Sequence, residues 1–147
     1  MFLKILQIAI PFIWFGMVGA ISFVEAPLKF RAPNITLALG LGIGKLVFQM
    51  LNRIEIAFAA LMLASLFFAR PATNFALYVF GAIFVLLLLQ TVWLLPLLYV
   101  RAEQVIAGIA APHSNNHLIF IAFEVLKFIL LFILGASLLK GNLRFNQ

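Results

Sequence analysis

Hydrophobic residues run along this chain in four long stretches separated by short polar segments. The stretches cover about residues 2–24, 45–69, 74–100 and 117–139. A helix needs roughly 20 consecutive apolar residues to cross the hydrocarbon core of a bilayer, and each stretch is long enough. The pattern therefore predicts an all-α integral membrane protein, a four-helix bundle with up-down topology, and one transmembrane domain over residues 1–147.

Prolines and polar residues mark the ends of the predicted spans. The first span ends before Pro27, because proline disfavours helix in the residue that precedes it, and Arg70-Pro71 ends the second. The turn that follows, up to Thr73, is tight. The links from Glu25 to Gly44 and from Arg101 to Asn116 are longer, and each has room for a short interfacial helix.

Composition supports this class and limits the chemistry. Of the 147 residues, 66% are hydrophobic and 10% are charged, whereas soluble domains carry about 25% charged residues. The formal net charge of +6 suits anionic lipid head groups and requires no nucleic acid partner. Because the chain has no cysteine, disulfides, thiol redox chemistry and cysteine-ligated metal sites are excluded.

Cationic residues near the span ends normally indicate which side of a membrane protein faces the cytoplasm. Here they divide evenly between the two predicted sides, so the orientation stays open. We expect an integral protein of the bacterial inner membrane, in contact with the lipid bilayer. The cations on the side of both termini are Lys4, Arg70, Lys140 and Arg144. Those on the opposite side are Lys29, Arg31, Lys45 and Arg101.

The second predicted span carries polar residues at membrane depth. On a helical wheel, Lys45, Gln49 and Asn52 share one narrow arc, with Arg53 and Glu55 on its two shoulders. Ionisable groups inside a span are costly and usually face a bundle interior or a watery cavity. We therefore expect this face of the span to turn inward.

The fourth predicted span has its own polar face, because Glu124 and Lys127 are three residues apart. With the stripes turned inward, Arg53 or Lys127 meets Glu55 or Glu124 across the interior. The structural alternative is that these groups form ion pairs and hydrogen bonds that only fix helix packing. The functional reading predicts a polar intramembrane pocket with eight candidate residues: Gln7, Trp14, Gln49, Asn52, Arg53, Glu55, Glu124 and Lys127.

Two histidines, His113 and His117, precede the fourth apolar run and are four residues apart. If the helix begins near Pro112, both lie on one face and are candidate metal ligands. In the alternative reading, a side chain of Ser114-Asn115-Asn116 caps the helix and the imidazoles lie at the head groups. We predict the cap, with no metal site and no cofactor.

Small residues four apart occur twice, as Gly40 with Gly44 and as Gly16 with Ala20. Such pairs let membrane helices approach each other closely. We expect them to form a contact between helices of one chain or the interface of a homodimer.

Four segments carry a resemblance to a known family: LKILQIAIPFIWFG (residues 3–16), APLKFR (26–31), GKLVFQMLNRIE (44–55) and IFIAFEVLK (119–127). The chain resembles small four-span membrane proteins of the HemJ-type protoporphyrinogen oxidase and copper resistance protein D superfamily. The resemblance implies an oxidoreductase using haem or quinone, with Lys29 and Glu124 at a basic and an acidic family position. The family's haem-ligating histidine falls on Gln7, which has no imidazole.

Three functional hypotheses follow from the sequence. The first is a non-enzymatic membrane protein whose polar pocket binds or passes a small or amphipathic solute. The second is the HemJ-like oxidoreductase, with Glu55 or Glu124 carrying a proton. The third is a non-catalytic assembly subunit of a larger membrane complex, in which the buried charges are structural.

Overall fold

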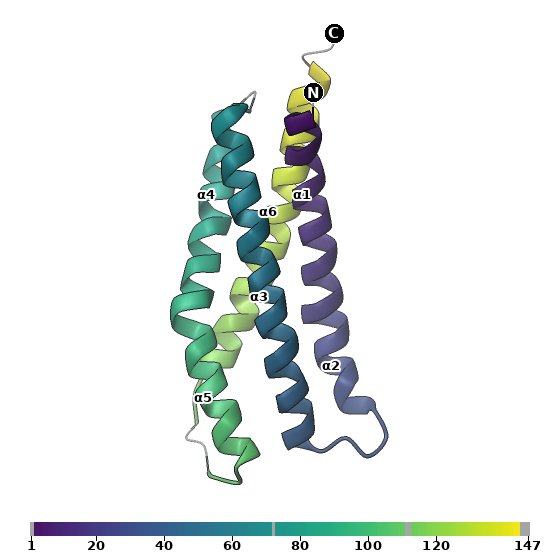
Figure 1. Ribbon diagram of the computed structural model, residues 1–147, viewed down its shortest axis with the longest axis vertical. Helices are drawn as coiled ribbons and strands as arrows, with labels where there is room; N and C mark the ends of the chain where they lie inside the picture. Colours follow the sequence, from purple (N-terminus) through teal and green to yellow (C-terminus); the bar gives the residue numbers. More distant parts are fainter. Residues whose placement is uncertain (1, 72, 111–112, 145–147) are drawn as a thin grey trace.

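The computed structural model describes residues 2–71, 73–110 and 113–144, and these residues are almost entirely helical. Figure 1 shows the helices side by side, with both termini at one end and the α2–α3 and α5–α6 connections at the other. The elements, in chain order, are α1 (Phe2–Val18), the π-helix η1 (Gly19–Glu25), α2 (Ala26–Leu28), the 3₁₀-helix η2 (Lys29–Arg31), α3 (Leu37–Phe68), α4 (Asn74–Leu89), the π-helix η3 (Gln90–Leu94), α5 (Leu95–Ile106) and α6 (Asn116–Arg144).

Four of the resulting helical stretches are long and apolar enough to cross a membrane: Phe2–Arg31, Leu37–Phe68, Asn74–Ile106 and Asn116–Asn142. The four predicted apolar helices are confirmed. The first two are longer than the apolar pattern indicated because most of the expected link from Glu25 to Gly44 is helical, and the third continues into the link after Arg101 as far as Ile106. Thr36 starts α3 by accepting a hydrogen bond on its Oγ1 from the Leu39 amide at 3.2 Å, which satisfies one of the free N–H groups of the first turn.

The core draws side chains from all four stretches. α1 packs against α6 and α3, α4 packs against α6, and α5 packs against α3 more extensively than against α6. The main hydrophobic cluster includes Trp14, Met62, Ile83 and Leu131. It occupies the half of the molecule near the termini, and a smaller cluster around Leu94 and Phe120 lies further away.

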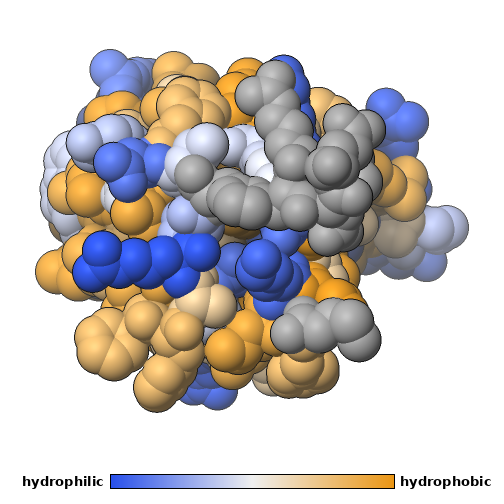
Figure 2. Space-filling model, turned by 90° about the horizontal axis from the view of Figure 1, so that it is seen from above, coloured by the Kyte–Doolittle hydropathy of each residue, from blue (hydrophilic) through white to orange (hydrophobic). Residues whose placement is uncertain are grey.

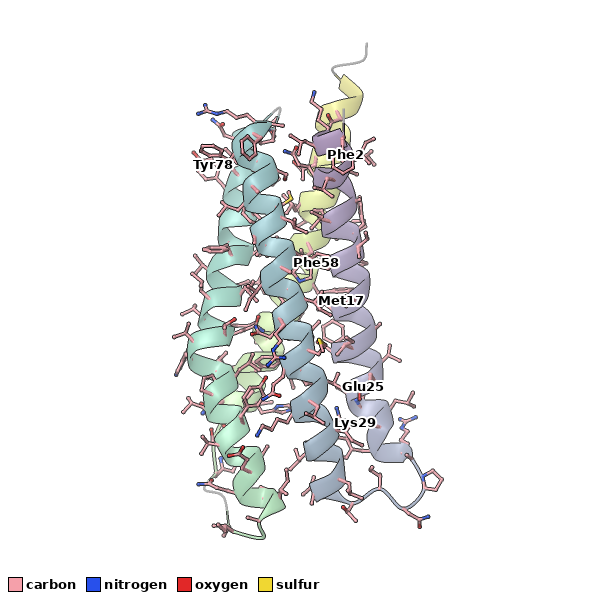
Figure 3. The ribbon with its side chains drawn as sticks, viewed as in Figure 1. Phe2, Met17, Glu25, Lys29, Phe58 and Tyr78 are labelled. Atoms are coloured by element: carbon pink, nitrogen blue, oxygen red, sulfur yellow. The ribbon has the colours of Figure 1, made fainter. Side chains whose placement is uncertain are left out.

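The outer surface of the bundle is also hydrophobic, with Phe67 82% exposed and Phe2 and Tyr78 each 74% exposed. Figure 2 looks onto the end with the termini, where hydrophilic residues gather amid a largely hydrophobic circumference. Phe2 and Tyr78 lie near this end (Figure 3). An apolar belt between polar ends is the surface expected of a protein whose sides face lipid.

Glycines let aromatic rings approach the helix backbones. A Cβ on Gly40 would lie 2.2 Å from the Phe30 ring, and a Cβ on Gly44 would lie 3.1 Å from Lys29 Nζ. The predicted close contact at Gly40 and Gly44 is therefore confirmed as one within the chain, between α3 and the end of the first span. The second small pair lies on open surface, since a Cβ on Gly16 would meet nothing within 4 Å.

Two π-helical segments interrupt the spans, and each is followed by a proline. The Ala26 amide donates to the Ile21 carbonyl and the Leu95 amide to the Gln90 carbonyl, in both cases five residues back. Pro27 and Pro96 come next. Because proline has no N–H and its ring crowds the carbonyl four residues back, the helix widens there instead of continuing with regular bonds.

Candidate functional site

A cluster of three charged side chains lies in the middle of the bundle. Lys127 Nζ lies 2.6 Å from Glu55 Oε1 and 2.6 Å from Glu124 Oε1. All three residues are at most 3% exposed. Glu124 and Lys127 share one face of α6, and Glu55 reaches them from α3. Of the predicted contacts across the interior, which joined Arg53 or Lys127 to Glu55 or Glu124, the structure has the one between Lys127 and Glu55.

Neutral polar groups form hydrogen bonds with the residues of this charge cluster. Trp14 Nε1 donates to Glu55 Oε1 at 2.8 Å. Gln90 accepts from Lys127 Nζ at 2.8 Å and donates through Nε2 to Glu124 Oε1 at 2.7 Å. Ser22 Oγ donates to Glu124 Oε2 at 2.6 Å. The cluster thus takes a side chain from each of the four spans, so it ties them together at one level.

Two of the cluster's polar residues depend on the π-helical segments. Ser22 lies in η1, and Gln90 is the first residue of η3. A π-helical turn adds a residue to the turn and changes the direction in which the following side chains point. Such turns are frequent at functional sites, and here both occur at the level of the charge cluster.

The charges of the cluster do not balance. With all three groups ionised, two carboxylates face one ammonium, which leaves one excess negative charge. Buried charge without compensation is strongly unfavourable. The arrangement can therefore hold a proton between the carboxylates and Lys127, and it can respond to a charge that arrives beside Glu124.

A cavity of about 840 Å³ lies directly beside the cluster, toward the end of the bundle opposite the termini. Glu124 and Ser22 contribute to its inner wall. Glu124 lies about 12 Å along α6 from the start of the helix, at 1.5 Å per residue. The other lining residues come from η1, α2 and η2, the start of α3, α5, and the start of α6 with the residues just before it. They include Lys29, Phe30, Lys45, Phe48, Leu98, Tyr99, Arg101, Ala102, His113, His117 and Phe120.

The structure divides the eight candidates from the sequence. Trp14, Glu55, Glu124 and Lys127 come together in the charge cluster. Asn52 lies nearby and donates to Thr91 Oγ1 at 2.8 Å, linking α3 to η3. Gln49, Gln7 and Arg53 are not among these contacts, and each has a different position.

Gln49 is half-buried on α3, while Gln7 lies toward the termini. The Gln7 side-chain amide donates to the backbone carbonyls of Ser65 and Ala69, at 2.9 and 2.6 Å. It therefore clamps the start of α1 to the end of α3. The Gln7 side chain thus makes a packing contact between two helices, and the oxidoreductase hypothesis stays a prediction.

Arg53 was expected to face the interior, and this expectation is wrong, because its side chain is exposed. Residues two apart on a helix point about 200° apart. Since Glu55 is buried against Lys127, Arg53 must turn away from the interior. The wheel placed both residues on the shoulders of one arc, and only contact with the other helices decides which shoulder is inside.

The two histidines lie at the rim of the cavity. His113 and His117 are exposed, and α6 begins at Asn116, whose amide donates to Ser114 Oγ at 3.2 Å. The predicted cap is confirmed, with Ser114 as the acceptor, whereas Pro112 lies outside the described residues. Within the described residues, no group of three or more His, Cys, Asp or Glu side chains is placed to hold a metal ion.

Several residues of the site were not among the sequence candidates. Ser22 and Gln90 are uncharged, and neither stands out within its apolar run. The available signals were Pro27 and Pro96, because a proline inside a span locates a distorted turn one or two residues earlier. Of the cationic lining residues, Lys29 and Arg101 were assigned to span ends, and Lys45 both to a span end and to the inward face of the second span. The sequence does not show which ends converge.

No family model, curated protein or solved structure matches this chain.

Proposed function

We propose that this protein is an integral protein of the bacterial inner membrane, built as a single up-down four-helix bundle, whose cavity binds or passes a small or amphipathic solute. The turns at the ends of the first and third spans lie at the interface in this arrangement. Gly16 in α1 and Ala20 in η1 are both exposed and suit contact with a second copy.

The observation that carries the proposal is the position of Glu124. This carboxylate belongs to the buried charge cluster and also forms part of the cavity wall. A solute in the cavity can therefore reach a charged group deep in the bundle, and such groups usually mark ligand or ion pathways in membrane proteins. The cavity volume also falls within the usual range of about 300–1,000 Å³ for ligand pockets.

Access to the cavity can be measured with cysteine variants, because the chain contains no cysteine. Ser22→Cys places a thiol on the cavity wall, whereas Ser65→Cys places one in the core near the other end, where Ser65 is 2% exposed. We expect a charged thiosulfonate reagent to label the first variant in membranes and not the second, as measured by mass. Equal protection of both thiols would show that the cavity is closed to polar solutes.

Binding can be tested by filling the cavity. Ala102 lines it, so Ala102→Trp occupies its space, while Ala82→Trp adds the same bulk at an exposed position on α4. Native mass spectrometry of gently extracted protein, supplied with lysophospholipids of one chain length, should show adducts on the wild type and on Ala82→Trp. Loss of the adducts in Ala102→Trp alone is the expected result, and equal adducts on all three proteins would contradict a binding cavity.

A further inference from the structure

The charged residues that line the cavity are mostly cationic. Lys29, Lys45 and Arg101 contribute to the wall, and Glu124 is the acidic lining residue. Glu124 shares Lys127 with Glu55, and Lys127 Nζ lies 2.6 Å from each carboxylate. Cationic side chains therefore outnumber acidic ones on the cavity wall.

The two lysines have carboxylate partners, but Arg101 is incompletely paired. Lys29 Nζ lies 3.2 Å from Glu25 Oε2, and Figure 3 shows these two residues close together toward the lower end of the first span. Lys45 pairs with Glu103. By contrast, one terminal nitrogen of Arg101 is buried and has no hydrogen-bond partner in the described part of the chain.

Tyr99 has the second unpaired polar atom of this kind. Its hydroxyl is buried without a partner among the described residues, and the Tyr99 and Arg101 side chains both line the cavity. A buried donor without an acceptor costs about 1–3 kcal/mol, so such groups normally have a partner. Two unpaired donors on a wall that also carries cationic side chains are suited to an oxyanion, which accepts hydrogen bonds from both kinds of group.

Aromatic side chains form the apolar part of the same cavity. Phe48 and Phe120 pack edge to face with their ring centroids 5.6 Å apart. Lys29 Nζ lies 5.6 Å from the Phe48 ring centroid and 5.7 Å from that of Phe30. Cationic groups and a hydrocarbon-like wall are therefore adjacent, so one ligand can contact both at once.

We infer that the cavity is selective for an anionic amphiphile, whose phosphate or carboxylate head binds Arg101 and Tyr99 and whose hydrocarbon chain lies against Phe48 and Phe120. This inference rests on the proposed solute-binding function and names the ligand class. Lys29 and Lys45 lie on the same cavity wall, where ion pairs with Glu25 and Glu103 hold them in place. A zwitterionic head of the same chain length would bring a cation against Arg101 and bind less well.

The test compares two lysophospholipids with the same acyl chain, lysophosphatidate and lysophosphatidylcholine, titrated against the full-length protein in a nonionic detergent. We expect lysophosphatidate to bind at least about tenfold more tightly, since one charge-assisted hydrogen bond is worth about that factor. Palmitate should compete with it, as the carboxylate form of the same chemistry. Inorganic phosphate at millimolar concentration should not.

Variants separate the head-group contacts from folding. Arg101→Gln should weaken lysophosphatidate binding about tenfold and leave lysophosphatidylcholine binding unchanged. Arg31→Gln removes the same charge at an exposed position at the same end, outside the cavity, and should bind as the wild type does. Tyr99→Phe removes only the hydroxyl, so it remains informative if Arg101→Gln fails to fold.

Each contrary outcome has a distinct meaning. Equal binding of both lysophospholipids, still blocked by Ala102→Trp, would overturn the anion selectivity and leave the proposed function intact. If inorganic phosphate displaced lysophosphatidate as effectively as palmitate does, the ligand would not need a hydrocarbon chain. That result would overturn the amphiphile as the ligand class and indicate that the cavity binds a free oxyanion. Failure of both lysophospholipids to bind would overturn this inference. If the thiol reagent also failed to label Ser22→Cys, the proposed function would be overturned as well.

Discussion

At the scale of single residues, Lys127 determines whether the interior of this bundle is stable. It is fully buried and contacts Glu55, Glu124 and Gln90. Two carboxylates at hydrogen-bond distance from one ammonium repel each other unless that ammonium or a proton lies between them. Lys127 therefore links α3 to α6, and its charge would interact electrostatically with a ligand beside Glu124.

Replacing Lys127 by methionine keeps the length of the side chain and removes its charge. We expect Lys127→Met to destabilise the protein by about 3–5 kcal/mol, because both glutamates are left buried without a counter-ion. Thermal unfolding in detergent measures the effect. Lys140→Met, at an exposed position on the same helix, is the matched control and should change the stability little.

A triple variant distinguishes charge from packing. Adding Glu55→Gln and Glu124→Gln to Lys127→Met removes the uncompensated charges, so part of the lost stability should return. If the single and combined variants unfold at the same temperature, packing by the lysine stem and not its charge stabilises the site.

At the scale of secondary structure, the spans are shaped by local departures from regular α-helix. η1 and η3 present Ser22 and Gln90 to the charge cluster, and Pro27 and Pro96 follow them. After η1, the chain forms the short helices α2 and η2 before it reaches α3. Phe30 and Lys29 in η2 then pack against Gly40 and Gly44, and the same two side chains line the cavity.

The glycines of α3 provide a paired test of this packing. In Gly40→Ala the added methyl group would lie 2.2 Å from the Phe30 ring, whereas in Gly42→Ala it would meet nothing within 4 Å. We expect Gly40→Ala to cost about 1–3 kcal/mol through overpacking. Gly42→Ala should instead be neutral or stabilising by up to about 1 kcal/mol, through helix propensity.

Unfolding temperatures of the two alanine variants, measured side by side, decide this prediction. Because Phe30 is displaced only in Gly40→Ala, that variant should also bind lysophosphatidate more weakly. Equal stability of the two variants would mean that Phe30 does not occupy the space above Gly40 in solution.

At the scale of the whole molecule, the bundle has two dissimilar halves. The half near the termini is filled by a continuous apolar core in which all four spans meet. In the other half α5 packs mainly against α3, and α5 and the start of α6 both line the cavity. The charge cluster lies between the solid half and the hollow half, so the solid half provides a rigid base for the cavity.

The proposed up-down arrangement predicts which segments share a side of the membrane. Figure 1 places the loop after η2 and the loop after α5 at one end and the turn between α3 and α4 at the other. An impermeant thiol reagent should therefore label Ala32→Cys and Ile109→Cys from the same side, and Thr73→Cys from the opposite side. Ala59→Cys, in the core at 2% exposure, is the unlabelled control, and labelling of all three loop sites from one side would contradict the topology.

The sequence by itself determined the four apolar helices and the burial of Glu124 and Lys127 on the fourth. The reason is the cost of charge in hydrocarbon, which depends on residue type and depth and hardly on the neighbours. Long apolar runs must likewise form helices, because only helices satisfy the backbone inside a bilayer without other strands.

Only the tertiary structure decided which way each helix turns and where its side chains meet. Arg53 and Glu55 were equivalent on the helical wheel, and packing against α6 buried one and exposed the other. Ser22 and Gln90 joined the cluster because π-helical turns changed their direction, and Lys29, Lys45 and Arg101 lined one cavity because three separate span ends converge. Helix rotation and convergence arise from contacts between residues distant in the chain, so they cannot be read from the periodicity of any one span.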